Sequence, residues 1–196
     1  MVILVLDGRI DWSASEDRKL TFALAFAGKI GSGKTTLTTA LAAEIGCKRA
    51  SFGDYVRYVV DQRGLEQTRE NLQNIGTEVL ELDRRIFCTN VLQHVGWRRG
   101  DSIVIDGLRH SETIDLLQEL VSPAKLKIIY VTIDDDIRLD RLGVRGDGDR
   151  RALTTAESHS SEKQVNSVLA YRADLVIDGG MPIADNVRRI IDWVKD

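Results

Sequence analysis

Short apolar runs alternate with longer amphipathic stretches over most of this chain. The apolar runs have the composition of strands that are buried on both faces of a sheet. They occupy residues 20–27, 102–106, 126–133 and 174–178, and the shorter, more polar stretch 48–52 is also a predicted strand. Between them, apolar residues recur every three or four positions, which predicts helices. The predicted helices cover 35–45, 53–62, 68–82, 86–97, 134–142 and 182–195, with one more capped by Ser111. Strands that alternate with helices predict a parallel α/β sheet with right-handed crossovers.

Three segments stand apart from this alternation. Residues 1–19 precede the first core strand, and their pattern fits an edge strand, a hairpin or an interface element. Residues 53–100 are helical throughout, which predicts a subdomain over the carboxyl edge of the sheet, where α/β folds bind ligands. Residues 138–160 include a stretch rich in glycine and arginine, which is typical of a short lid. The last two segments belong to a single predicted domain over 20–196.

Composition narrows the class of protein without naming an activity. The chain has 196 residues, of which 43% are hydrophobic and 29% charged, as in a globular domain. The net charge of −3 argues against a nucleic acid partner, and no apolar run is long enough to span a membrane. The apolar start over 1–6 lacks the basic residues of a secretory signal. Cys47 and Cys88 show no metal-binding spacing, so we expect small buried side chains in a reducing cytoplasm.

Residues 28–35 carry the most specific chemical signal. Gly28-Lys-Ile-Gly-Ser-Gly-Lys-Thr35 matches the phosphate-binding P-loop, G-x-x-x-x-G-K-[ST]. Its glycines let successive backbone N–H groups turn toward phosphate oxygens, and the following helix directs its positive end at the same place. Lys34 can follow the β- and γ-phosphates, and the Thr35 hydroxyl can bind Mg²⁺. We therefore predict a site for ATP and Mg²⁺, formed by Gly28, Gly31, Ser32, Gly33, Lys34, Thr35 and Thr36.

Acidic residues follow two of the predicted strands. Asp106 ends the strand 102–106, where a P-loop protein places a second acid beside Mg²⁺, so Thr35 and Asp106 form the predicted metal site. A hydrophobic strand that ends in aspartate is common, and the signal is weak without its neighbours. The run 134–136 also follows a strand, but N-capping of the next helix explains these acids better than a metal cluster does.

Four further motifs follow the P-loop. Ser51-Phe-Gly-Asp-Tyr-Val-Arg57 resembles the Ser/Thr-x-Gly-Asp-x-x-Arg pattern of adenylate-kinase-like proteins, and Asp106-Gly-Leu-Arg109 resembles their Asp-Gly-x-Arg. Asp140-Arg-Leu-Gly-Val-Arg145 is similar to the entry of their lid. The stretch 69–77 resembles Arg-x-x-x-Gln-x-x-Gly-Thr of deoxynucleotide kinases. Together with the P-loop, these motifs resemble the P-loop nucleoside monophosphate kinases and their relatives, which include dephospho-CoA kinases.

The resemblance implies a role for each matching residue. Arg57 and Arg109 would hold the phosphate of the acceptor, and guanidinium groups do pair bidentately with phosphate oxygens. Asp54 and Gln73 would contact the acceptor as well, with Asp54 as the base if a hydroxyl is phosphorylated. A surface helix residue is the competing interpretation for Arg57 and for Gln73.

The resemblance places Arg141 near the donor adenine and Arg145 at the donor phosphates. Lys34, Asp106, Arg109 and Arg145 would then carry the transfer. Arg138, Arg150 and Arg151 add charge nearby, and a solvated basic face is the competing interpretation for these three. The implied fold is the three-layer P-loop NTPase fold, with a five-stranded parallel sheet in the order 2-3-1-4-5.

The predicted function is phosphoryl transfer from Mg·ATP to a small nucleotide, in first place a (deoxy)nucleoside monophosphate. Two motifs of relatives are missing, namely the Arg-x-Asp-Asp stretch that adenylate kinases carry after Arg145 and the Asp-x-Asp of dephospho-CoA kinases. The sequence therefore leaves open the identity of the acceptor, and also whether the chain forms a homodimer. The alternatives are a nucleotide-gated ATPase or interaction module and a dephospho-CoA-type hydroxyl kinase. A kinase directed at nucleic acid is weaker, because of the acidic balance.

Overall fold

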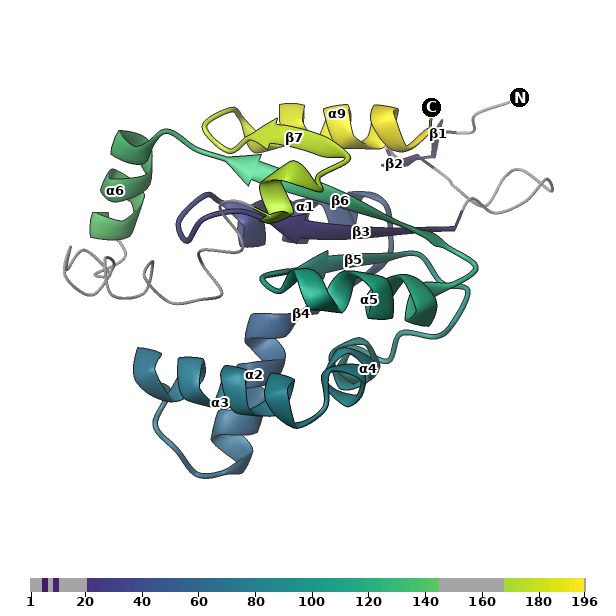
Figure 1. The fold of residues 1–196 in the computed structure, drawn as a ribbon. Coiled ribbons are helices and arrows are strands. Elements are labelled where there is room, and N and C mark those ends of the chain that lie inside the picture. The colour runs from purple at the N-terminus through teal and green to yellow at the C-terminus, as the bar shows by residue number, and fades with distance from the viewer. Residues whose placement is uncertain (1–4, 7–8, 11–20, 145–167, 196) are drawn as a thin grey trace.

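A computed structural model of the chain describes residues 5–6, 9–10, 21–144 and 168–195. Its backbone forms a five-stranded sheet between two layers of helices (Figure 1). The strands are β3 (Phe22–Ala27), β4 (Lys48–Ser51), β5 (Ile103–Asp106), β6 (Lys125–Thr132) and β7 (Leu175–Asp178). They are parallel and lie in the order β4-β5-β3-β6-β7. Counted from the P-loop strand this is the order 2-3-1-4-5, so the predicted α/β fold is confirmed.

The helices follow the predicted stretches, with small differences at their ends. They are α1 (Lys34–Glu44), α2 (Phe52–Gln62), α3 (Arg69–Leu82), α4 (Arg84–His94), α5 (Ile114–Val121), α6 (Asp135–Val144) and α9 (Ile183–Lys195). The largest difference is in α4, which was predicted over 86–97. It begins earlier because the Asp83 side chain accepts a hydrogen bond from the Ile86 N–H at 2.8 Å, as an N-cap does. It ends before Gly96, whose φ of 64° no longer fits a helix.

The predicted cap at Ser111 is wrong. Ser111 lies in a 3₁₀ turn, η1 (Ser111–Thr113), and its hydroxyl contacts Glu112 at 3.4 Å. The helix α5 begins only at Ile114, and its N-cap residue Thr113 makes no side-chain capping bond. Instead the Thr113 hydroxyl donates to the His110 carbonyl at 2.7 Å, which closes the turn locally. A serine after a loop is a weak sign of a helix start, because the same hydroxyl can stabilise a turn.

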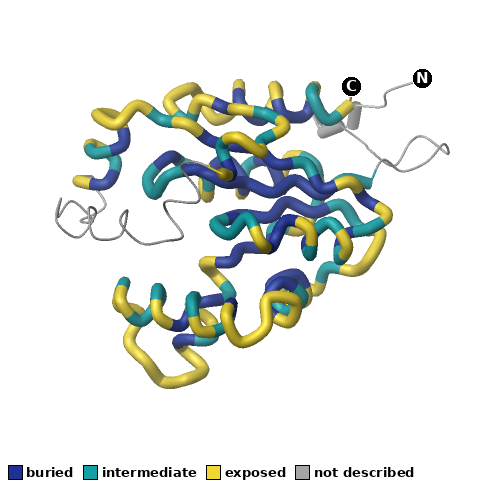
Figure 2. The backbone as a smooth tube through the Cα atoms, in the orientation of Figure 1, coloured by how far each residue is buried: buried dark blue, intermediate teal, exposed yellow. Residues whose placement is uncertain are grey.

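Two hydrophobic clusters hold the layers together, one on each face of the sheet. Along β3, Ala23 and Ala25 point to the face that α2, α4 and α5 cover, while Leu24 and Phe26 point to α1 and α9. All four side chains are at most 1% exposed, and the central strands are the most deeply buried part of the chain (Figure 2). Burial on both faces explains why these strands are apolar at consecutive positions.

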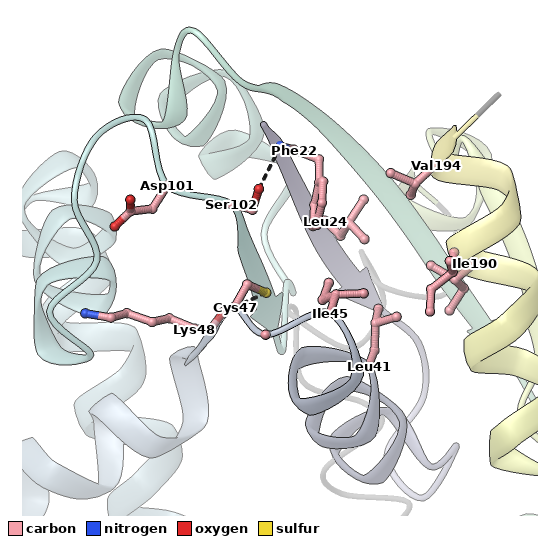
Figure 3. Close-up of a pocket in the computed structure, with 12 residues that line it drawn as sticks. Phe22, Leu24, Leu41, Ile45, Cys47, Lys48, Asp101, Ser102, Ile190 and Val194 are labelled. Atoms are coloured by element: carbon pink, nitrogen blue, oxygen red, sulfur yellow. Dashed lines mark hydrogen bonds between the residues drawn. The ribbon is translucent and has the colours of Figure 1, made fainter. Parts of the chain in front are cut away.

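The sheet has two edges of different character. At the carboxyl edge, β3 runs directly into the P-loop, and Asp106 of β5 lies level with Phe26 of β3 and Ser51 of β4. At the amino edge, a pocket of about 290 Å³ opens between α1 and α9. Figure 3 shows its apolar lining, which includes Leu41 and Ile190, with Ser102 at the rim. The phosphate-binding motif and this apolar pocket therefore lie at opposite ends of the same strands.

Two predicted segments fall largely outside the described residues. In the N-terminal segment 1–19, the structure describes only β1 (Val5–Leu6) and β2 (Arg9–Ile10), which pair antiparallel. The lid predicted over 138–160 is described up to residue 144, and its remainder lies outside the described residues. Within the part of the chain that the structure describes, no helix combines the length and the hydropathy needed to cross a membrane.

Candidate active site

The P-loop forms a backbone cradle between β3 and the N-terminus of α1. Gly28 and Gly33 have φ angles of 147° and 88°, which L side chains rarely adopt. A Cβ atom at Gly28 would lie 2.4 Å from the Val131 carbonyl oxygen of β6, so only glycine fits between the loop and the sheet. Ser32, within the loop, is fully buried, and α1 starts at Lys34. The N–H groups that open the helix therefore face the cradle that the motif predicts.

The half-buried Lys34 side chain folds over this loop. Its Nζ donates to the carbonyl oxygens of Gly28 and Lys29, at 2.5 and 2.7 Å. Burial, with the added repulsion of Arg109, lowers the pKa of Lys34 from 10.5 to about 7 against the opposing attraction of Asp106. A phosphate bound in the loop would place negative charge beside the ammonium and favour its protonated form. Lys34 is thus suited to bind an anion and to take up a proton as it does so.

Thr35 and Asp106 meet where the predicted metal site lies. The Thr35 hydroxyl donates to Oδ2 of Asp106 at 3.0 Å, and Asp106 is only 3% exposed. Hydroxyl and carboxylate oxygens are ligands that Mg²⁺ accepts. The described residues contain no group of three or more His, Cys, Asp or Glu side chains that could hold a metal alone. The pair fits a Mg²⁺ ion that takes its other ligands from nucleotide phosphates and water, which is the usual arrangement for this ion.

Sequence reasoning missed Arg49, which lies in the centre of the site. Its guanidinium group donates from Nε to the Thr38 hydroxyl at 2.9 Å, from Nη1 to Asp54 at 2.9 Å, and from Nη2 to Asp106. Asp54 in turn accepts a hydrogen bond from Arg57 at 2.8 Å. The predicted residues Asp54, Arg57 and Asp106 are therefore brought together, with Arg49 joining them.

A second group of arginines gathers on the side where the sequence predicts the acceptor. The pKa of Arg109 lies below its ordinary value because the side chain is withdrawn from water and because Arg57 and Arg69 are close by, while Asp106 opposes the shift. A guanidinium group stays protonated, so the shift records above all the withdrawal of this charge from water, with the positive charges of Arg57 and Arg69 adding to it. Such crowding of positive charge is unfavourable unless an anion, here Asp106 or a bound phosphate, lies among the charges.

Arg69 is the other residue that sequence reasoning left without a role. It opens α3, and Gln73 lies one helical turn beyond it, half-buried. Within the described residues the Gln73 side chain forms no hydrogen bond, so its contact with the acceptor substrate stays a prediction. The signal for Arg69 was present in the stretch 69–77. Arg49 gave no such signal, because a polar residue on an edge strand is normally solvated.

A hollow lies beside the loop, on the side where the sequence predicts the nucleotide donor. It has a volume of about 480 Å³, within the range of small-molecule sites. Its lining includes Gly33, Thr36, Arg141, Gly179 and Asn186. Nη1 of Arg141 donates to the Gly179 carbonyl at 3.0 Å, so this predicted donor residue does reach the hollow. Arg145 lies outside the described residues.

Helix α6 closes over the loop and corrects one interpretation. A solvated basic face was an open interpretation for Arg138, but this side chain is 6% exposed, and its Nε donates to Asp135 at 3.0 Å. A Cβ at Gly31 would lie 3.1 Å from Arg138 and 3.0 Å from Leu142, so α6 packs directly on the P-loop. Lys29 adds an ion pair to Asp135 at 3.2 Å. Arg150 and Arg151 lie outside the described residues.

Comparisons with solved structures show where this fold recurs. The fold matches a gluconokinase from Sinorhizobium meliloti with a TM-score of 0.57 and 18% identity, covering 91% of this chain and 94% of that one. It matches a shikimate kinase from Bacteroides thetaiotaomicron with a TM-score of 0.58 and 16% identity, covering 89% and 99%. At these identities the likeness shows the fold alone, which is that of P-loop kinases.

Sequence comparisons point to one group of relatives. A UPF0200 protein of Pyrobaculum aerophilum is 35% identical over 126 residues, covering 64% of this chain and 67% of the relative. A UPF0200 protein of Aeropyrum pernix is 30% identical over 160 residues, covering 80% and 84%. The family model AAA_18, described as an AAA domain, matches residues 24–171, which include the P-loop and both arginine groups. The chain therefore belongs to the AAA_18 family of P-loop domains, together with the UPF0200 proteins, and has the fold of P-loop kinases.

Proposed function

We propose that this chain transfers the γ-phosphoryl group of Mg·ATP to the phosphate of a small nucleotide, in first place a (deoxy)nucleoside monophosphate. The observation that carries the proposal is the crowding of Arg57, Arg69 and Arg109 beside the P-loop lysine and Asp106. A site that only binds ATP needs no second group of cations. A second, phosphate-bearing substrate would use them, because it must approach ATP against strong charge repulsion.

Each described residue has a defined task in such a transfer. The loop N–H groups and Lys34 hold the β- and γ-phosphates, and the arginines orient the acceptor phosphate in line with them. An acceptor oxygen forms the new bond to the γ-phosphorus while the bond to the β-phosphate oxygen breaks, so ADP leaves with the electron pair. Mg²⁺, held on the Thr35 and Asp106 side, would neutralise charge on the phosphates. A phosphate acceptor is already ionised, so no base is required.

The position of Asp54 favours a phosphate over a hydroxyl acceptor. A hydroxyl kinase needs a base, and Asp54 is the candidate for it. Yet Oδ1 of Asp54 accepts from Arg57 at 2.8 Å and Oδ2 accepts from Arg49 at 2.9 Å. Both carboxylate oxygens are thus already engaged by guanidinium groups, and an acceptor hydroxyl would have to displace one of them. The dephospho-CoA-type alternative is therefore less well supported, and the proposed substrates, ATP and a nucleotide, suit the cytoplasm.

The test is a turnover screen with purified protein, Mg·ATP and a panel of acceptors. The panel contains ribo- and deoxynucleoside monophosphates, dephospho-CoA, gluconate and shikimate, and both ADP and the phosphorylated product are measured. We expect a nucleoside monophosphate to raise ADP release at least tenfold. Lys34→Ala and Arg109→Ala should each lower that turnover by about 100-fold or more, the usual scale for the loss of a transition-state donor.

A matched control separates charge from position. Arg63→Ala removes an arginine of the same subdomain that forms an exposed pair with Glu78 at 2.8 Å, and it should leave turnover unchanged. If no acceptor raises ADP release and a protein partner does, the chain is a nucleotide-gated module. If dephospho-CoA or a sugar acid alone is phosphorylated, the hydroxyl kinase alternative holds.

A further inference from the structure

We infer that Arg49 is a positioning residue that links the acceptor helix α2 to the metal-side carboxylate Asp106. The expected effect of Arg49 on turnover rests on the proposed function, whereas its expected effect on Mg²⁺ binding does not. Arg49 comes from β4, which lies at one edge of the sheet, yet its side chain reaches the centre of the site.

The guanidinium group of Arg49 distributes its donors over three elements. Nε donates to Thr38 of α1, Nη1 to Asp54 of α2, and Nη2 to Asp106 of β5. Three nitrogens thus hold three separate acceptors, each with one bond. The planar fork fixes these directions, and a lysine ammonium, a point charge on a flexible stem, cannot meet all three at once.

The Thr38 contact orients this fork. Thr38 is fully buried, and its hydroxyl donates to the Thr35 carbonyl at 3.0 Å, which leaves its lone pairs for Arg49. Thr35 is also the residue whose hydroxyl bonds to Asp106. The direction of Arg49 is therefore tied to the first turn of the P-loop helix, where the metal-side hydroxyl lies.

The Asp106 contact selects one oxygen of the carboxylate. Among the described residues, both recorded hydrogen bonds to Asp106 go to Oδ2, one from Thr35 and one from Arg49. Oδ1 is left to accept from a metal-bound water. The Arg49 side chain is 17% exposed and that of Asp106 is 5% exposed, so the pair is shielded from solvent. A partner that holds a metal-side carboxylate in place commonly changes metal affinity by about 10- to 100-fold.

The Asp54 contact extends the linkage to the acceptor side. Asp54 uses its other oxygen to hold Arg57, one turn further along α2. A continuous set of hydrogen bonds therefore runs from Thr35 through Asp106, Arg49 and Asp54 to Arg57. A change at either end alters the charge that the next group feels, so the position of the acceptor arginine and that of the metal-side carboxylate should depend on each other.

Conservative variants give each link a distinct signature. The first readout is the Mg²⁺ concentration at half-maximal binding of AMP-PNP, a non-hydrolysable ATP analogue, measured by calorimetry. The second is the KM of the acceptor found in the turnover screen. Asp106→Asn should raise the Mg²⁺ midpoint more than the acceptor KM, and Asp54→Asn should raise the acceptor KM more than the Mg²⁺ midpoint. Arg49→Lys should raise both, each by about tenfold.

Arg63→Lys serves as the control, because it makes the same chemical change in the exposed pair with Glu78. It should leave both readouts within twofold of the parent. Thermal unfolding of every variant without nucleotide identifies a simple loss of fold. If Arg49→Lys lowers stability but leaves the Mg²⁺ midpoint within twofold of the parent, Arg49 is only a structural residue and the inference is wrong.

The two readouts separate this inference from the proposed function. If no acceptor is found in the screen, the proposed function fails, and the Mg²⁺ midpoint still tests Arg49. If an acceptor is found and Arg49→Lys changes only its KM, the transfer stands and the link to Asp106 is overturned.

Discussion

The pocket at the amino edge of the sheet and the candidate site at its carboxyl edge lie at opposite ends of the same strands and differ in the side chains that gather there. At the amino edge, Leu24, Leu41, Ile190 and Val194 line an apolar pocket (Figure 3). At the carboxyl edge, the P-loop, Asp106 and a set of lysine and arginine side chains face one another. The charged residues in the pocket lining are Lys48 and Asp101, and they lie beside neither a P-loop nor a cluster of arginines.

The direction of the strands explains this difference. In a parallel sheet all carboxyl ends lie at one edge, so the loops that leave them, and the helix N-termini that follow, converge there. The amino edge receives helix C-termini and short turns, and its apolar lining closes the core formed by α1 and α9. Clustered cations beside a backbone cradle therefore identify the candidate site better than apolar volume does.

The first and largest way to break this comparison is to remove a cation at the carboxyl edge. Arg69→Ala should raise the acceptor KM by about 10- to 100-fold, because a hydrogen bond to a charged group contributes about 1.5–3 kcal/mol. ATP binding should change by less than threefold, since Arg69 lies on the acceptor side near Arg109. Steady-state kinetics with the acceptor and ATP varied in turn would measure both values.

Arg85→Ala is the matched control for Arg69→Ala. Arg85 belongs to the same helical region but pairs with Glu119 on the surface, where an ion pair contributes little. Equal losses in both variants would mean that the helical region acts through its overall charge, and the assignment of Arg69 would fall.

Contiguous motifs made the donor side predictable from the sequence. Residues 28–35 sit in one loop, and each position has a task that local geometry explains, so the structure brings them together as expected. Asp106 was predictable because the end of a parallel strand must lie at the ligand edge. The parallel sheet followed from the alternation of strands and helices, and the order of its strands followed from the resemblance to P-loop kinases.

Long side chains that act across elements were not predictable in the same way. Arg49 lies two residues before the end of β4, level with Val104, and its sequence neighbours do not reveal that its guanidinium group extends to Asp106. Arg138 was open to a solvated interpretation because its burial depends on how α6 packs on Gly31. In both cases the distance in space depends on tertiary packing, which spacing along the chain does not record.

The second prediction concerns Lys34 and proton uptake. Its pKa is about 7 in the nucleotide-free protein, against 10.5 when the lysine is free in water. Between these values the folded protein binds fewer protons at Lys34 than the unfolded chain, so this group makes stability rise with pH from about 7 to 10.5. A bound phosphate raises the pKa again. ATP binding at pH 8.5 should therefore take up about one proton, and affinity should fall by up to tenfold per pH unit.

Calorimetric titration of ATP in buffers of different ionisation enthalpy would measure this uptake. Phosphate groups lose their last proton near pH 6, so ATP itself contributes little at pH 8.5. Lys34→Arg should abolish the uptake, because arginine does not deprotonate, whereas Lys29→Met should preserve it. If the Lys34→Arg variant takes up as many protons on ATP binding as the parent, the proton goes to another group. The chemical contrast between the amino and carboxyl edges of the sheet would then be weaker.

The smallest expected effect on catalysis comes from the amino edge, and it tests whether the two edges are independent. Ile190 of α9 is fully buried and lines the apolar pocket. Ile190→Ala should lower the free energy of unfolding by about 2–4 kcal/mol, through lost burial and the cavity left behind. The cost should fall at the lower end of that range, because the pocket already leaves one side of Ile190 with few packing partners. In urea the midpoint of unfolding should fall while the slope m stays constant.

At a temperature where the Ile190→Ala variant is fully folded, kcat/KM for the acceptor should stay within twofold of the parent. The reason is that no described contact of the P-loop or of the arginines passes through this side chain. A tenfold loss of kcat/KM in the folded variant would mean that α9 transmits strain from the pocket to Asn186, one helical turn away in the donor hollow, and that the amino edge takes part in nucleotide binding.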